Sequence, residues 1–315
     1  MLQKILGLPI DVSAQGPSID RLIAYMHLLM LVLFVGWTAF FIYTLIRFRR
    51  SRHPRADHEG VKTHASSYLE GFVAVLEIAL LVGLSIPFWA RKVGAFPSDA
   101  QNPLHVRVIA QQFAWNIQYP GPDGKFGRTE LKLVSDDNSI GLDRKDPSGK
   151  DDVVELNQLY VPVSRPVVID ITSKDVIHSF FLPFLRVKQD AIPGMSIPIY
   201  FTPTMTSEQV RQREIQTTKL PSELNLDLYA TMQDYSDKDG NVLVKKGSLL
   251  TARAVKKLMD NGIAEITVAP YYPIEIACAQ LCGLNHYRMK GFLNVLSEKD
   301  FEKWYADEVE SQKEE

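Results

Sequence analysis

The run Leu22-Ile-Ala-Tyr-Met-His-Leu-Leu-Met-Leu-Val-Leu-Phe-Val-Gly-Trp-Thr-Ala-Phe-Phe-Ile-Tyr-Thr-Leu-Ile46 contains no charged residue. About 20 apolar residues are enough for a helix to cross a bilayer. A second run, Gly71 to Ala90, is also long enough, although it contains Glu77. Core helices of soluble proteins are shorter and have a polar face, and a signal peptide has a shorter apolar core and a small-residue cleavage site. We therefore predict two transmembrane helices, residues 21–48 and 69–92.

The linker between these runs is basic. It contains Arg47, Arg49, Arg50, Arg52, Arg55 and Lys62. The N-terminal flank offers only Lys4 and Arg21. An excess of positive charge is typical of cytoplasmic loops, so residues 49–68 are predicted to be cytoplasmic. Residues 1–20 and everything after the second helix would then lie outside the inner (plasma) membrane, in the periplasm of a Gram-negative cell.

Charge divides along the same boundary. Residues 1–92 have a net charge of +4 and the remaining residues have −6, in agreement with −2 for the whole chain. A mildly acidic outer domain favours encounter with a basic protein partner by electrostatic steering. We predict no nucleic-acid partner.

Beyond residue 92 the chain changes to short β-branched segments separated by Pro, Gly and Asp. The predicted strands are 105–110, 159–163, 166–172, 196–202 and 274–278. Many short strands with turn residues between them are typical of a β-sandwich or barrel. We expect segment 120–152, which is rich in Gly, Asp and Lys, to be a long surface loop. Ser297 with Asp300 resembles a capping box that opens a polar helix in the tail, residues 298–315.

Residues 206–268 differ from the flanking segments in their residue pattern. A compact unit follows a polar stretch, with a predicted helix at 252–261 and a strand at 264–268. The pattern resembles small barrel-sandwich modules of unrelated proteins. It contains no His, no Cys and no phosphate-binding loop. We interpret it as an inserted β-rich module without catalytic groups, and a docking role is the alternative to a purely structural one.

The only two cysteines stand together, in Cys278-Ala-Gln-Leu-Cys282-Gly-Leu-Asn-His286-Tyr-Arg-Met289. A short disulfide is the simplest alternative in an oxidising compartment. Thiolate, imidazole and thioether groups at this spacing are, however, the ligands that select copper over hard cations. A further histidine is required, and His178 in Asp175-Val-Ile-His178-Ser is the candidate. We place it after a strand, at the edge of the predicted sheet.

These motifs resemble the binuclear copper A site of cytochrome c oxidase subunit II. Pro203, the segment 185–195 and the two-helix anchor extend the resemblance over residues 21–204 and 270–297. It implies a two-helix transmembrane hairpin plus an all-β cupredoxin-like external domain, residues 93–205 and 269–297. The module 206–268 lies outside the resemblance.

The resemblance also implies a ligand set for two copper ions. Cys278 and Cys282 would bridge both ions through their thiolates. His178 and Met289 would complete one copper. His286 and the backbone carbonyl of Gln280 would complete the other.

The implied function is that of an oxidase subunit. It would accept electrons from cytochrome c, or a cytochrome c domain, and pass them to haem in catalytic subunit I, where oxygen is reduced to water with proton translocation. Subunit III and membrane lipid are further expected partners. Haem is expected only in the partner, and a fused cytochrome c domain is excluded because the chain has no Cys-x2-Cys-His.

The chain departs from the family pattern at two places. Gln280 stands where many members have a Glu that helps to hold magnesium, and Asp190 matches an acidic residue near that ion. Mg²⁺ prefers carboxylates and water, so we leave the presence of a magnesium site undecided. Phe113 stands where many members have the Trp that receives the electron. Phe113 is the candidate for electron acceptance, with Trp115 either sharing that role or packing in the core.

Two carboxylates mark the second apolar helix. Glu70 resembles the family Glu at the mouth of a proton-uptake path. Glu77 lies about two turns deeper, where a carboxylate is energetically unfavourable and is usually functional or paired. Its role is left open.

Three other classes of protein compete with this interpretation. A quinol-oxidase type of subunit lacks the thiolate pair, which is present here. A copper-delivery protein would not require the double membrane anchor. A nitrous-oxide reductase has a similar copper site, but it is far longer and has a second, His-rich domain.

Overall fold

The computed structural model describes residues 5–55, 58–59 and 62–313, and the chain divides into two compact units. One unit is Ser18–Pro97, and the other joins Met1–Pro17 to Ser98–Glu315. Lys4, part of the predicted loop 49–68 and the end of the predicted tail 298–315 lie outside the described residues. The two units are described separately below.

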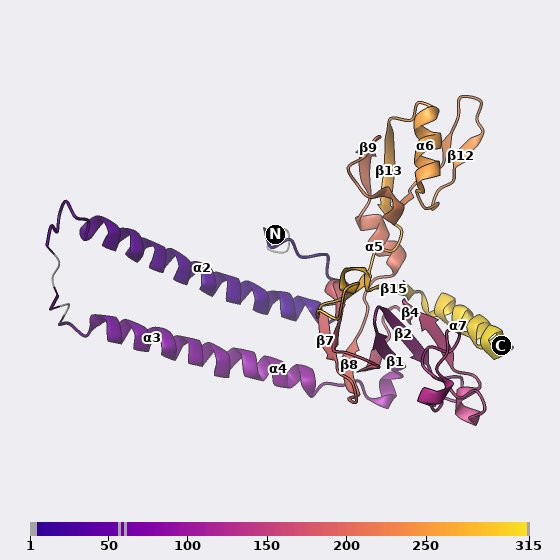
Figure 1. Ribbon diagram of the computed structural model, residues 1–315, viewed down its shortest axis with the longest axis horizontal. Coiled ribbons are helices and arrows are strands. Elements are labelled where there is room, and N and C mark those ends of the chain that lie inside the picture. Colours follow the sequence, from indigo (N-terminus) through magenta and orange to yellow (C-terminus); the bar gives the residue numbers. More distant parts are fainter. Residues whose placement is uncertain (1–4, 56–57, 60–61, 314–315) are drawn as a thin grey trace. The chain divides into compact units, whose positions relative to one another are not determined.

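The first apolar run forms helix α2, Gly16–Arg47 (Figure 1). It begins before the predicted limit of 21. The Gly16 amide donates to the Ser13 hydroxyl at 2.9 Å, and Pro17 has a backbone geometry that suits a first helical turn. The helix is long and apolar enough to cross a membrane, and its apolar side chains are exposed.

The second span is one continuous helix of three parts, α3 (Ala65–Leu80), the π-helix η1 (Leu81–Ser85) and α4 (Ile86–Val93). It starts earlier than the predicted residue 69. Pro87 lies in the first turn of α4 and has no amide N–H to continue a regular α-helical ladder. The wider π turn stands directly before it, where such turns relieve a broken pattern. Ala65–Arg91 is also long and apolar enough to span a membrane.

The outer unit contains two five-stranded sheets. The first has the order β3-β2-β1-β5-β8, with β1 (Leu104–Gln111), β2 (Ala114–Tyr119), β3 (Val153–Leu156), β5 (Val167–Ser173) and β8 (Ile197–Phe201). The second has the order β4-β15-β14-β6-β7, with β4 (Gln158–Pro162), β6 (His178–Leu182), β7 (Val187–Ala191), β14 (Glu275–Cys278) and β15 (Lys290–Leu296). Pairs β1–β5 and β4–β15 are parallel, and the other neighbours are antiparallel. The predicted fold class, two apolar helices plus an all-β cupredoxin-like domain, is confirmed.

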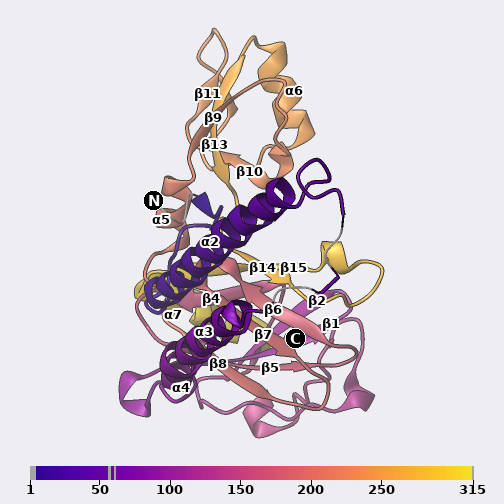
Figure 2. The same cartoon turned by 90° about the vertical axis from the view of Figure 1, so that its left-hand side faces the viewer.

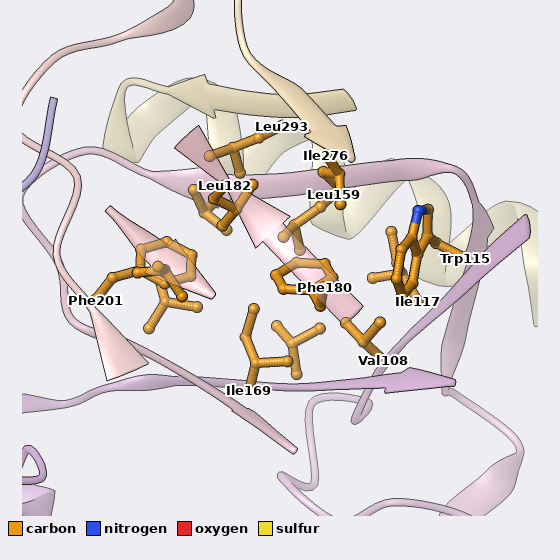
Figure 3. Packing of buried hydrophobic residues seen from close by; sticks show 14 of the residues in the cluster. Val108, Trp115, Ile117, Leu159, Ile169, Phe180, Leu182, Phe201, Ile276 and Leu293 are labelled. Carbon is orange, nitrogen blue, oxygen red and sulfur yellow. The ribbon is translucent and has the colours of Figure 1, made fainter. Parts of the chain in front are cut away.

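Both sheets contribute to one apolar core (Figure 3). Val108 and Ile169 from the first sheet lie near Phe180 from the second. Trp115 is fully buried, and its ring meets Phe180 edge-on with 5.3 Å between centroids. This core supports the strand ends from which the candidate ligands project.

The five predicted strands agree with the structure to within one residue at each end. Strands β2, β3, β6, β7 and β15 were not predicted as strands. His178 follows β5 in the chain, as expected, and is itself the first residue of β6. The run His178–Leu182 is too short for its sequence alone to distinguish a strand from a loop.

Segment 206–268 folds around a core of its own. Its elements are α5 (Ser207–Arg213), β9 (Gln216–Lys219), β10 (Tyr229–Thr231), β11 (Tyr235–Ser236), β12 (Val242–Val244), α6 (Ala252–Asp260) and β13 (Glu265–Pro270). Its core residues are Leu226, Tyr235, Val244, Leu250, Leu258, Ile266 and Val268. Helix α5 anchors the module to the barrel. Ser207 Oγ donates to the Leu293 carbonyl at 3.3 Å and accepts from the Val295 amide at 2.9 Å.

The C-terminal helix α7 spans Glu298–Lys313 and is capped as predicted: the Asp300 amide donates to Ser297 Oγ at 3.2 Å. Trp304 stacks on Tyr160 with 4.2 Å between ring centroids, so the helix covers the barrel. Between β2 and β3 the chain forms only turns, short 3-10 helices and the isolated bridge Thr129–Leu142, as expected for the long loop 120–152.

Candidate metal centre

His178 opens β6 and its side chain is fully buried. Its ring meets Trp115 edge-on, with 6.2 Å between centroids. Nε2 lies 2.8 Å from Asp175 Oδ1, so the carboxylate accepts a hydrogen bond from the Nε2–H group. Nδ1 then presents a lone pair, and it lies 3.2 Å from Met289 Sδ.

The sulfur-containing loop joins β14 to β15. Strand β14 pairs with β6, with Cys278 opposite Phe180. The pairing continues one residue further, where the Ala279 amide donates to the Ser179 carbonyl at 2.9 Å. This strand pair places the first cysteine beside His178, although about 100 residues separate them.

The predicted donors lie together around the loop. Cys278 Sγ is 3.9 Å from Cys282 Sγ and 3.9 Å from His178 Nδ1. Cys282 Sγ is 3.5 Å from His286 Nδ1 and 3.7 Å from Met289 Sδ. The Gln280 carbonyl oxygen lies 3.2 Å from Cys278 Sγ. The cysteines are free thiols, so the disulfide alternative does not describe this structure.

The two thiols differ in acidity. Burial raises the pKa of Cys278, but hydrogen bonding to His178 and to nearby main-chain groups outweighs burial and lowers it to about 6. Burial and the charge of Cys278 raise the pKa of Cys282 to about 11. Burial lowers the pKa of His178, but Cys278 and Asp175 outweigh it and raise this pKa. Cys278 is therefore ready to bind a cation at neutral pH, whereas Cys282 must release a proton when it binds one.

The donor chemistry fits copper. Ligand atoms of His178, Cys278 and Cys282 all lie within 4.8 Å of one another. The two thiols, two imidazoles and thioether are soft or borderline ligands, unsuited to magnesium or calcium, and only the Gln280 carbonyl is a hard donor. Cys282 and Met289 are only 3% and 1% exposed, so this part of the site excludes water.

The chain is similar to known proteins of one family. The family described as cytochrome c oxidase subunit II, periplasmic domain, matches residues 104–209. The alternative cytochrome c oxidase subunit 2 of Bradyrhizobium diazoefficiens is 25% identical over 275 residues, 86% of this chain and 73% of that protein. This chain is similar in sequence to cytochrome c oxidase subunit II. The cytochrome c oxidase subunit 2 of Thermostichus vulcanus is 27% identical over 218 residues, 60% of this chain and 64% of that protein, so the match spans less than two thirds of that relative.

Solved structures of this family are also similar. The periplasmic domain of subunit II of cytochrome oxidase from Bradyrhizobium japonicum has 19% identity and a TM-score of 0.34, over 66% of this chain and 94% of that one. A chain of a heme-copper terminal oxidase dimer has 12% identity and a TM-score of 0.33, over 73% of this chain and 99% of that one. At these scores, the fold assignment rests on the strand order of this chain itself.

The two aromatic candidates lie in different environments. Phe113 is half-buried in the turn between β1 and β2, and a Cβ atom on Gly283 would lie 3.1 Å from its Cζ. Phe113 is therefore adjacent to the sulfur-containing loop between β14 and β15. Trp115 lies in the core with no exposed surface, so it cannot contact a protein partner directly.

The candidate magnesium and proton side chains are not part of this cluster, although the Gln280 carbonyl is. Asp190 is exposed on β7, opposite Ser179 in the strand register, and the Gln280 side chain is exposed on the loop. Glu70 and Glu77 both lie on α3, in the other unit. They are seven residues apart, which places them on one helix face about 10 Å apart along the axis.

Sequence reasoning assigned no role to Asp175 and Gln112. Asp175 orients the His178 ring, and Gln112 Nε2 donates to the Cys282 carbonyl at 2.5 Å. A carboxylate three residues before a ligand histidine could have indicated Asp175, because metal-binding histidines commonly donate their second N–H to a carboxylate. No local signal indicates the contact of Gln112.

Proposed function

We propose that the chain accepts electrons singly from cytochrome c at a binuclear copper A centre and passes them to haem in the catalytic subunit of a respiratory haem–copper oxidase. The observation that carries this proposal is that the His178 side chain lies next to Cys278 and Met289 of the sulfur-containing loop. Oxygen reduction would occur in the partner subunit. Homology to subunit II supports the same assignment.

In the proposed site, the thiolates of Cys278 and Cys282 would hold a pair of copper ions. His178, Met289, His286 and the Gln280 carbonyl would supply the remaining ligands. When bound, such a pair would supply one-electron transfer. The residues of this chain hold the ligands rigidly and keep water away, which favours fast electron transfer.

The surface beside the loop suits a protein donor. Leu281, Leu284 and Tyr287 are 77%, 95% and 67% exposed, an apolar group next to the proposed centre. Exposed apolar patches commonly mark interaction sites. Phe113, in contact range of Gly283, is our candidate for the first residue to receive the electron. The net negative charge of the outer domain would steer a basic cytochrome c toward it.

We further propose a two-pass orientation, with both termini and the copper domain outside the inner membrane. Subunit I, and subunit III beside it, would cover the exposed apolar faces of α2 and of Ala65–Arg91, together with lipid. Asp190 is the remaining candidate for an interfacial magnesium ion. Glu70 would take up protons at the cytoplasmic side, and Glu77 carries no assigned role.

Copper loading of the full chain in detergent tests the central claim. We expect two copper ions per chain and a mixed-valence two-copper spectrum in electron paramagnetic resonance. His178→Ala should abolish that spectrum, whereas His105→Ala, on an exposed residue of β1, should leave it unchanged. A single-copper signal in the unmodified chain, or no binding, would refute the proposal.

A further inference from the structure

Gln112 contacts both segments that carry the metal donors. It lies in the turn between β1 and β2. Its amide donates to Asp175 Oδ2 at 2.7 Å, and its side-chain Nε2 donates to the Cys282 carbonyl at 2.5 Å. These partners lie 63 and 170 positions further along the chain. Gln112 therefore hydrogen-bonds both to the segment Asp175–His178 and to the sulfur-containing loop between β14 and β15.

The main-chain contact acts on His178 through Asp175. The Asp175 carboxylate accepts from the Gln112 amide, from the Val176 amide at 2.7 Å and from His178 Nε2 at 2.8 Å. Both of its oxygens are thus held. A carboxylate fixed in this way sets the tautomer and the orientation of a metal-binding imidazole.

The side-chain contact acts on the loop. Cys282 lies between exposed neighbours, Leu281 and Gly283, so few packing contacts restrain the main chain there. Gly283 has a φ of +138°, and a Cβ atom at this position would lie 2.7 Å from Gln112 Nε2. The bare glycine backbone is what allows the amide to approach the Cys282 carbonyl so closely.

We propose that Gln112 is a positioning residue of the metal centre, holding the Cys282 segment at a constant distance from the Asp175–His178 pair. The inference rests on the proposed function, since it takes these donors as copper ligands. Without the side-chain contact the loop would open more often, and bound copper would be released faster. Groups just outside a metal's ligand shell typically contribute 10- to 100-fold to metal affinity.

The test uses the full chain and substitutions that retain the main-chain amide of residue 112. Gln112→Ala removes the side-chain contact, and Gln112→Glu keeps the size but removes the N–H donor. Gln111→Ala is the matched control, because its side chain accepts from Lys174 and contacts neither ligand segment. Two quantities are measured: copper release to a chelator, and, without metal, the rate at which Cys282 reacts with a thiol reagent, located by mass spectrometry.

We expect both Gln112 variants to release copper about 10- to 100-fold faster than the unmodified chain. Cys282 in the metal-free variants should also react faster, while Gln111→Ala matches the unmodified chain. Unchanged rates in Gln112→Ala would overturn the proposal, and unchanged rates in Gln112→Glu alone would show that packing acts instead of the hydrogen bond. If the unmodified chain binds no copper pair, the proposed function fails, but the thiol rates still decide whether Gln112 holds the loop.

Discussion

Replacing Gly283 by alanine should loosen the metal loop without removing any donor. Its φ of +138° is a conformation that costs a residue with a side chain about 1–3 kcal/mol. The new Cβ atom would lie 2.7 Å from Gln112 Nε2 and 3.1 Å from Phe113 Cζ. Gln112 can move away only by giving up its hydrogen bond to Cys282, which stabilises the loop by about 1 kcal/mol. The combined effect of about 2–4 kcal/mol corresponds to a roughly 30- to 700-fold larger open population.

Amide hydrogen exchange of the metal-free full chain measures this opening directly. The peptide covering residues 279–289 should exchange faster by that factor in Gly283→Ala. Gly262→Ala is the control, because Gly262 also has a positive φ, +75°, but no atom within 4 Å of the added Cβ. It should perturb only its own turn in the inserted module. Exchange of 279–289 within threefold of the unmodified chain would refute the argument from the loop geometry.

Four further predictions concern the rest of the molecule. Burial and the nearby Glu308 raise the pKa of Glu155 to about 7, so the folded chain holds a proton that the unfolded chain has released, and stability falls as pH rises toward 7. Glu155→Gln should therefore stabilise the outer domain at pH 8, by on the order of 1 kcal/mol after solvent screening, and little at pH 5. Glu302→Gln is the exposed control, and an equal gain at both pH values would contradict the linkage. Trp115→Ala should cost about 3–5 kcal/mol by leaving a core cavity, seen as a lower thermal midpoint, and an unchanged midpoint would show that the core tolerates the loss. Phe113→Leu should slow electron uptake from cytochrome c in stopped-flow measurements while the copper spectrum persists, and an unchanged rate would remove Phe113 from the path. Glu70→Ala should reduce proton-coupled turnover of the assembled oxidase with copper content intact, whereas normal turnover would exclude the proton-uptake role.

Features that depend on a local pattern of residues could be predicted from the amino-acid sequence. The uncharged run 22–46 indicates a membrane helix because its length and apolarity are sufficient for spanning a bilayer. Five strands were predicted to within one residue because β-branched runs are bounded by Pro, Gly and Asp. The spacing from Cys278 to Met289 indicated a soft-metal site because all of the proposed donors except His178 lie in one short loop.

Contacts between segments that are distant in the chain could not be predicted in this way. Pairing of β14 with β6 brings Cys278 next to His178, although the whole module 206–268 lies between them in the chain. Strand β6 is too short to be identified by its own periodicity, and of its two partners only β7 is close in sequence, whereas β14 is about 100 residues away. The contacts of Gln112 likewise depend on a turn that is remote in sequence from both of its partners. Strands far apart in the chain can pair, and the local sequence of one strand does not specify which other strands will be its neighbours.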